Sequence, residues 1–172
     1  MRKVKTIVPN ILYQGARPGY YLPNRFKLNL HHIYNDVSFL QDQGIKSILC
    51  LLQEGEMQKY YNFDLLQKYQ DFKFAVYSYP VNDDKFMGSM KKETHFDLNH
   101  IWRIFEELPK PIYLHCSAGC MRSYYLAQKL YEKYIRVYGT QREFGGDFGS
   151  PFVEKPRLYH ETPYEYFDRT ED

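Results

Sequence analysis

The sequence has no long apolar run, few cysteines and little excess charge. No stretch approaches the roughly 18 consecutive apolar residues that a membrane span requires, so we expect no membrane association. Pro9, Asn10 and Gln14 interrupt the segment after the basic start of the chain, which excludes the apolar core of a signal peptide. The formal net charge of +2 gives no general attraction to nucleic acid, and no nucleic-acid partner is expected.

Cysteine usage and length limit the cellular compartment and the number of domains. Cys50, Cys116 and Cys120 are too few and too unevenly spaced for a disulfide framework, so the expected location is the reducing cytoplasm. A chain of 172 residues is long enough for one domain with its own hydrophobic core. We expect that domain at residues 1–135, and a Gly-, Pro- and Tyr-rich extended segment at 136–172 that packs on it or trails from it.

The hydrophobic periodicity alternates between strand and helix patterns. It predicts short extended segments at 4–8 and 10–14, and strands at 45–52, 72–80 and 112–115. It also predicts helices from 31 to a stop at Gly44, at 56–70, from an N-cap at Thr94 to Leu108, and at 122–135, with a polar loop at 81–94. The almost continuously apolar strand 45–52 is typical of a parallel strand buried on both faces. The order predicts a single α/β domain with a mostly parallel central sheet flanked by helices.

A short loop between the last predicted strand and helix carries the strongest chemical signal. Backbone N–H groups in such a loop, together with a helix N-terminus, form a site for a tetrahedral oxyanion. Gly119 permits a tight turn, and the planar guanidinium of Arg122 can bind two phosphate oxygens. These surroundings favour the thiolate form of Cys116, which makes it a nucleophile. The predicted phosphate-binding residues are Ser117, Ala118, Gly119, Cys120, Met121 and Arg122.

These groups predict hydrolysis of a phosphate monoester through a phosphocysteine formed on Cys116. Ser123 is expected to donate a hydrogen bond to the sulfur, and His115 to hold the loop from the strand side. A carboxylic acid must protonate the leaving group, and the loop after the strand at 72–80 offers two. Asp83 is preferred and Asp84 is the alternative. No metal and no cofactor is expected.

The motif HCSAGCMRS resembles the H-C-x5-R-S/T signature of the cysteine-based protein tyrosine phosphatases. The segment YPVNDD is similar to their acid loop, in which an Asp follows a Pro by about three residues, and this favours Asp83. The segment ILYQGARP, with its Tyr-x-Gly turn, resembles the opening of small dual-specificity and atypical phosphatases; the likeness covers roughly residues 7–135. The resemblance implies a protein tyrosine or dual-specificity phosphatase that needs no metal and binds oxyanions such as phosphate, sulfate or vanadate.

Some positions depart from the family pattern. Met121 stands where many members have Gly or Ser, and Tyr124 where many have Gly. Gln141 is the one candidate for a glutamine that positions water. Cys120 is either a small residue beside the pocket or a redox partner of Cys116.

The substrate is less strongly indicated than the reaction. The loop has no Lys or His, which favours a phosphorylated protein or peptide, with phosphotyrosine first. The alternatives are an inositol (pyro)phosphate or RNA 5′-phosphate phosphatase, for which Arg17, Lys91 and Lys92 would supply charge from other loops, and a non-catalytic phosphate-binding module. A sulfur-transfer or arsenate-reducing enzyme would also place a cysteine in an oxyanion loop.

Overall fold

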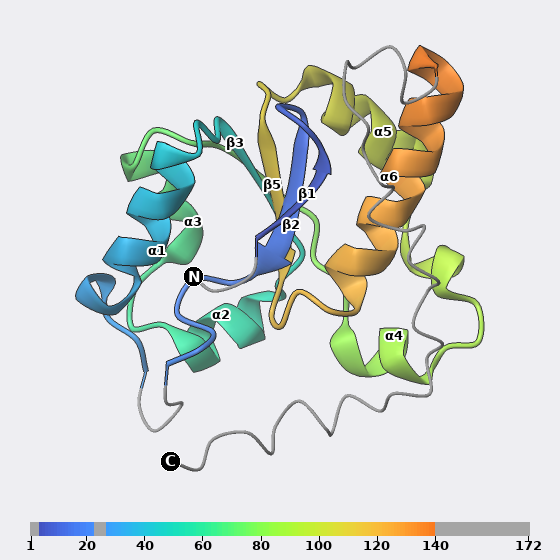
Figure 1. Cartoon of the computed structure of the whole chain (residues 1–172). Helices are drawn as coiled ribbons and strands as arrows, with labels where there is room; N and C mark the ends of the chain where they lie inside the picture. Colours follow the sequence, from blue (N-terminus) through green and yellow to red (C-terminus); the bar gives the residue numbers. More distant parts are fainter. Residues whose placement is uncertain (1–3, 23–26, 140–172) are drawn as a thin grey trace, which may run out of the picture.

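Five strands form one sheet at the centre of the protein (Figure 1). The structure is a computed structural model that describes residues 4–22 and 27–139. The strand order is β1-β2-β5-β3-β4, and only β1 and β2 pair antiparallel. The strands are β1 (Lys5–Val8), β2 (Leu12–Ala16), β3 (Ser47–Cys50), β4 (Ala75–Ser78) and β5 (Ile112–Cys116). The mostly parallel sheet predicted from the sequence is therefore confirmed.

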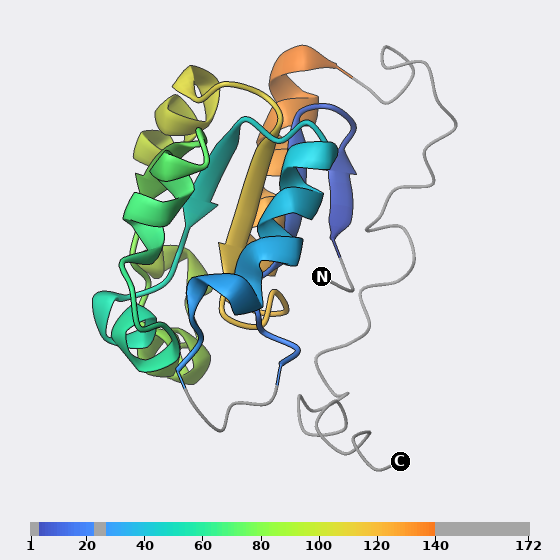
Figure 2. The same cartoon turned by 90° about the vertical axis from the view of Figure 1, so that its left-hand side faces the viewer.

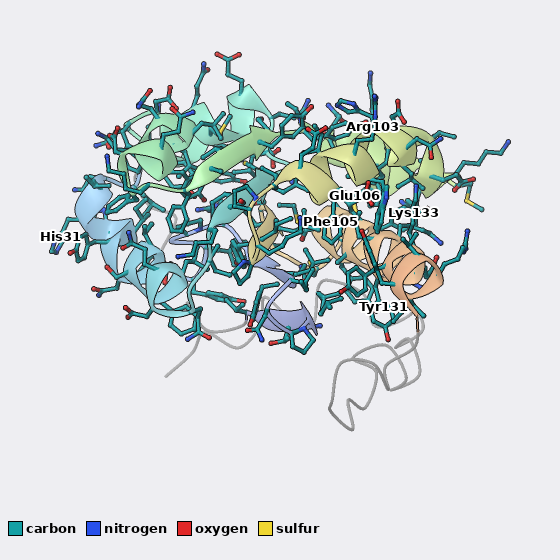
Figure 3. The ribbon with its side chains drawn as sticks, turned by 90° about the horizontal axis from the view of Figure 1, so that it is seen from above. His31, Arg103, Phe105, Glu106, Tyr131 and Lys133 are labelled. Atoms are coloured by element: carbon teal, nitrogen blue, oxygen red, sulfur yellow. The ribbon has the colours of Figure 1, made fainter. Side chains whose placement is uncertain are left out.

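Helices cover both faces of this sheet. One face carries α1 (Leu30–Asp42) and α3 (Leu65–Asp71), and the other carries α5 (Leu98–Glu107) and α6 (Arg122–Tyr138) (Figures 1 and 2). From above, α1 with His31 lies on the opposite side of the sheet from Phe105 of α5 and Lys133 of α6 (Figure 3). The short helices α2 (Glu54–Tyr60) and α4 (Asp83–Gly88) lie at one end of the sheet (Figure 1). The predicted α/β architecture is confirmed.

The position of β3 inside the sheet, between β5 and β4, explains why its sequence is almost continuously apolar. Ile48 and Cys50 belong to the core cluster beneath α1 and α3, whereas Leu49 and Leu51 belong to the cluster beneath α5 and α6. Successive side chains of a strand point to opposite faces, so a strand covered on both faces needs apolar residues at every position. The assignment of Cys50 as a core residue is also confirmed, since it is fully buried.

The helix predicted at 56–70 is two helices, α2 and α3. Between them the backbone of Tyr61 bridges to Leu28, and the Tyr61 hydroxyl donates to the carbonyl of Pro18 at 2.8 Å. A residue paired in this way cannot continue a helix, so the chain is extended there. Asp64 then caps α3 by accepting from the backbone N–H of Gln67 at 3.0 Å.

The segment predicted as a polar loop at 81–94 contains regular structure. Asn82 accepts from the N–H of Lys85 at 2.8 Å and begins α4, and a 3₁₀ turn spans Lys92–His95. The next helix has Asp97 rather than Thr94 as its N-cap, because the Asp97 carboxylate accepts from the N–H of His100 at 3.0 Å. The predicted start at Thr94 is wrong, as is the end of the last helix at 135, since α6 continues to Tyr138.

Gln141 and nearly all of the predicted C-terminal segment lie outside the described residues. Within the ranges 4–22 and 27–139, no helix is long and apolar enough to cross a bilayer.

Candidate active site

The loop between β5 and α6 lies at the carboxyl edge of the sheet, near α2 and α4 (Figure 1). The helix α2 follows β3 and α4 follows β4, so both begin at the edge where β5 ends. The carboxyl ends of parallel strands meet at one edge, which brings together residues that are distant in the sequence. Cys116 is the last residue of β5, stands opposite Ala16 of β2, and is only 2% exposed.

Two groups of the loop and helix face the sulfur of Cys116. The backbone N–H of Gly119 donates to Sγ at 3.3 Å, and the hydroxyl oxygen of Ser123 lies 3.2 Å from Sγ. Both are donors available to a thiolate, and hydrogen bonds to the charged form of a group stabilise that form. The structure thus places the Ser123 hydroxyl beside the sulfur.

Gly119 has a backbone that no other residue would adopt easily. Its φ is +75°, and a Cβ at this position would lie 2.4 Å from the backbone carbon of Gly15. The loop therefore packs directly on the end of β2, where the N–H of Arg17 also donates to the carbonyl of Ser117 at 2.9 Å. The glycine at position 119 permits this close approach.

His115 is buried in the sheet and holds the loop through its ring. Its Nδ1 lies 3.1 Å from the carbonyl oxygen of Cys116, which can only accept, so Nδ1 carries the proton. The Tyr69 hydroxyl then donates to Nε2, at 3.0 Å. Burial lowers the pKa of His115 to about 4, so the ring is neutral at physiological pH. These contacts make His115 a structural support for the loop from the strand side.

Arg122 begins α6 and is held from three sides. Its two Nη atoms donate to the two carboxylate oxygens of Glu56 at 2.7 Å each, and Nη1 also donates to the carbonyl of Val81 at 2.8 Å. The Nε atom lies 2.8 Å from Oδ1 of Asp83, in an ion pair without the alignment of a hydrogen bond. Although burial opposes the charged form, the bonds to Glu56 and the charges of Cys116 and Asp83 raise the pKa of Arg122.

The two candidate acids differ in position. Asp83, whose side chain is 49% exposed, faces Arg122, whereas Asp84 is exposed to solvent one residue further along α4. Partial burial raises the pKa of Asp83; Arg122 opposes the rise, and the charges of Glu56 and Asp84 add to it. Burial is the larger effect, so Asp83 holds its proton to higher pH than an ordinary aspartate. The geometry therefore favours Asp83 over Asp84 as a proton donor.

The remaining loop residues line the turn itself. Ser117 and Ala118 are partly buried, Cys120 is exposed, and Met121 packs against the core at the start of α6. Cys50 is a contrast to these thiols, because complete burial raises its pKa to about 12. The described residues hold no group of three or more His, Cys, Asp or Glu side chains that could bind a metal ion.

The three basic residues considered for a second phosphate lie in different environments. Arg17 is buried, 1% exposed, and its guanidinium lies 3.8 Å from the ring centre of Tyr60. Lys92 donates to the carbonyls of Phe86 and Met87, while Lys91 is exposed.

Two residues of the site did not emerge from the sequence as functional. Glu56, the partner of Arg122, lies in the first turn of the helix that follows β3, at the carboxyl edge of the sheet where ligands bind. An acidic residue at that position in the sequence could have indicated a functional role. Gln14 lies within strand β2 rather than in the expected Tyr-x-Gly turn, and it donates to the carbonyl of Gly119 at 2.5 Å and to the Ser123 hydroxyl at 2.8 Å. A polar residue in an otherwise apolar strand was its signal.

Cys116, Arg122 and Asp83 thus come together at the carboxyl edge of a mostly parallel five-stranded sheet. The family model of cyclin-dependent kinase inhibitor 3 (CDKN3) matches residues 10–136, and the chain belongs to this family. The rat and mouse proteins named cyclin-dependent kinase inhibitor 3 are each 28% identical over 105 residues, or 58% of this chain. The match covers 45% of the rat protein and 46% of the mouse protein, so the chain spans about half the length of these relatives.

Solved structures show the same fold. Kinase associated phosphatase, determined with its catalytic-site cysteine replaced by serine, superimposes with a TM-score of 0.54 at 22% identity, covering 71% of this chain and 65% of that chain. The PTP-2 phosphatase of Cydia pomonella gives a TM-score of 0.50 at 15% identity, covering 84% and 76%.

Proposed function

We propose that this chain is a cysteine-dependent protein phosphatase, of the protein tyrosine or dual-specificity type. The observation that carries the proposal is the position of Arg122, which is held by Glu56 and faces Asp83 beside the loop of Cys116. A nucleophile, an anion-binding cation and a half-buried acid thus lie at one edge of the sheet. This is the set of groups that phosphomonoester hydrolysis without a metal requires.

In the first step the phosphate dianion binds in the loop, and the Cys116 thiolate attacks phosphorus. The bond between phosphorus and the leaving oxygen breaks, and protonated Asp83 transfers its proton to that oxygen. In the structure the Asp83 carboxylate lies 2.8 Å from Nε of Arg122. A phosphate oxygen that binds this Nε takes the place of the carboxylate. Ligand binding therefore frees Asp83 and favours its protonated form.

In the second step water attacks the phosphocysteine, and the Asp83 carboxylate accepts a proton from that water. The sulfur–phosphorus bond breaks, its electron pair returns to sulfur, and inorganic phosphate leaves. The Ser123 hydroxyl, 3.2 Å from Sγ, donates a hydrogen bond to the thiolate as it departs. His115 acts through the backbone by holding the carbonyl of Cys116.

A phosphorylated protein or peptide is the substrate that we propose, with phosphotyrosine first. The names of the relatives, cyclin-dependent kinase inhibitor 3 and kinase associated phosphatase, support a protein kinase as a partner. The three free thiols support action in the cytoplasm, and phosphate, sulfate and vanadate are the proposed loop ligands.

Hydrolysis of p-nitrophenyl phosphate in the presence of EDTA tests the activity. We expect the wild-type protein to turn over, vanadate to inhibit it, and Cys116→Ser to abolish turnover while retaining the fold. Cys50→Ala is the control for loss of a thiol as such, because the Cys50 side chain is fully buried in the core cluster beneath α1 and α3. Unchanged turnover in Cys116→Ser would contradict the proposal.

Substrate class needs a binding experiment. Cys116→Ser keeps the loop but cannot form the phosphocysteine, so it should retain bound substrates. We expect it to bind a phosphotyrosine peptide more tightly than an inositol pyrophosphate, a phosphoinositide or an RNA 5′-phosphate in a fluorescence competition assay. If one of the other ligands binds more tightly than the phosphotyrosine peptide, the proposal of a protein substrate is wrong and the class of that ligand takes its place.

A further inference from the structure

Gln14 is a buried polar residue in strand β2, directly behind the catalytic loop. It stands opposite Leu114 of β5 in the sheet and is 0% exposed. Its Nε2 donates to the carbonyl of Gly119 at 2.5 Å and to Oγ of Ser123 at 2.8 Å. One side chain thus binds both residues, Gly119 and Ser123, whose donor groups face the sulfur of Cys116.

The direction of these hydrogen bonds follows from chemistry. The carbonyl of Gly119 can only accept, so the amide nitrogen of Gln14, not its oxygen, must face it. That nitrogen has two hydrogens, one for Gly119 and one for Ser123. Because the Ser123 oxygen accepts from Gln14, its own hydrogen is left to point at Sγ of Cys116, at 3.2 Å.

This arrangement carries a cost that a different residue would avoid. The Oε1 atom of Gln14 is buried and has no hydrogen-bond partner. An unpaired buried acceptor costs about 1–3 kcal/mol, whereas an apolar side chain of similar length leaves no such atom. Stability alone therefore does not explain a glutamine at this position. The two hydrogen bonds donated by its amide nitrogen explain it.

We propose that Gln14 is a positioning residue that fixes the Ser123 hydroxyl with its hydrogen toward Cys116. Its effect falls on the second chemical step, because the departing thiolate gains charge there and needs the donor most. The inference deepens the proposed phosphatase function and rests on it for the kinetic part. The orientation of Ser123 also acts on the resting thiolate, which is measurable without turnover.

Gln14→Met is the principal variant, because methionine has a similar length and no hydrogen-bond donor. We expect the breakdown of phosphocysteine to slow by about 3- to 10-fold, the range that corresponds to one hydrogen bond. In rapid-mixing experiments with p-nitrophenyl phosphate, nitrophenol should then appear as a burst of about one equivalent, followed by slower turnover. The rate of the burst itself should change little.

Ser123→Ala separates positioning from a general structural role. If Gln14 acts through Ser123, Gln14→Met should have no further effect on phosphocysteine breakdown in the Ser123→Ala background. A structural role would lower the rate by the same factor in both backgrounds. Equal factors would overturn the proposal.

The second readout is alkylation of Cys116 by iodoacetate as a function of pH, quantified on its peptide by mass spectrometry. The midpoint of this profile should move to higher pH in Gln14→Met and not move further when Ser123→Ala is added. A shifted midpoint in a protein without phosphatase activity would support the positioning of Ser123 and contradict the proposed function. An unshifted midpoint with normal phosphocysteine breakdown would overturn the role of Gln14.

Two further variants guard against misfolding. Gln128→Met, on α6, is the matched control and should leave both readouts unchanged. Gln14→Glu keeps the shape of the side chain but replaces the donor with an acceptor, so the Ser123 hydrogen turns toward the carboxylate. Its effect on breakdown should be at least as large as that of Gln14→Met; wild-type breakdown in a folded Gln14→Glu protein would overturn the proposal.

Discussion

Arg122 and Glu56 form a two-bond ion pair at 2.7 Å that joins the first turn of α6 to the first turn of α2. The same carboxylate accepts from the backbone N–H of Gln53 at 2.9 Å, so its position is fixed by the helix that carries it. Arg122 is 1% exposed, and its planar group is therefore oriented by the protein before any ligand arrives. Such preorganisation reduces the cost of ordering the guanidinium on phosphate binding.

The first prediction concerns this pair. Glu56→Gln should lower kcat/KM for p-nitrophenyl phosphate by about 10²-fold, because a small displacement of a positioning group has effects of that size. Loss of a charged partner from buried Arg122 should also lower the free energy of unfolding by about 3 kcal/mol. Steady-state kinetics and urea denaturation measure the two effects. Glu54→Gln, an exposed acid on the same helix, is the control and should change neither.

The second prediction is the pH dependence of the acid. Asp83 must be protonated to act, and burial raises its pKa, so activity should persist above the pH at which an ordinary aspartate ionises. As pH rises through the raised pKa, the proton is lost and kcat/KM falls. For a substrate with a poor leaving group, such as a phosphotyrosine peptide, Asp83→Asn should remove this alkaline limb. It should also lower the maximum kcat/KM by about 10²-fold.

Asp84→Asn is the matched variant for this experiment. It should keep the alkaline limb, moved slightly to lower pH, because the charge of Asp84 contributes to the raised pKa of Asp83. Loss of the limb in Asp84→Asn with its retention in Asp83→Asn would assign the acid to Asp84.

The sequence predicted the features of this site that depend on local pattern and strand direction. The loop is contiguous from Cys116 to Ser123, and its approach to Asp83 follows from two parallel strands that end at one edge. Glu56 was not predicted as the partner of Arg122, because the two residues are far apart in the chain and nothing local marks the pair. The break at Tyr61 was missed for the same reason, since it depends on pairing with distant Leu28.

The helix boundaries were predicted wrongly for a different reason. Thr94 and Asp97 are both good N-cap residues, and local sequence does not choose between them. The structure selects Asp97, whose carboxylate caps the helix and whose backbone N–H donates a hydrogen bond to the hydroxyl oxygen of Tyr79 at 2.9 Å. Tertiary contacts of this kind decide between equivalent local signals.

The third prediction tests the contact between the loop and β2. Gly119→Ala places a Cβ 2.4 Å from the backbone of Gly15 on a residue with φ of +75°. The left-handed conformation alone costs about 1–2 kcal/mol, and the clash requires the loop to move away from β2. We expect phosphatase activity and vanadate binding to be lost, with a melting temperature lower than that of the wild type.

Gly88→Ala provides the comparison for this variant. Gly88 lies at the end of α4, and a Cβ there would meet no atom within 4 Å. It should retain activity and vanadate binding. Full vanadate affinity in Gly119→Ala, measured by calorimetry, would show that the loop tolerates a side chain at this position.

The fourth prediction is acid destabilisation through His115. Burial lowers its folded-state pKa to about 4, whereas the unfolded chain has a value near 6.5, so the unfolded state binds more protons between these two values. Stability contributed by the neutral ring is present above about pH 6.5 and is lost as pH falls toward 4. His115→Gln should therefore show a weaker decrease in unfolding free energy than the wild type over this range, as measured by urea denaturation.

Tyr69→Phe is the comparison variant, because it removes the hydrogen bond to Nε2 of His115 but keeps the aromatic ring. It should lower the free energy of unfolding by about 1 kcal/mol while preserving the slope with pH. The same slope in His115→Gln as in the wild type would assign the acid sensitivity to other groups.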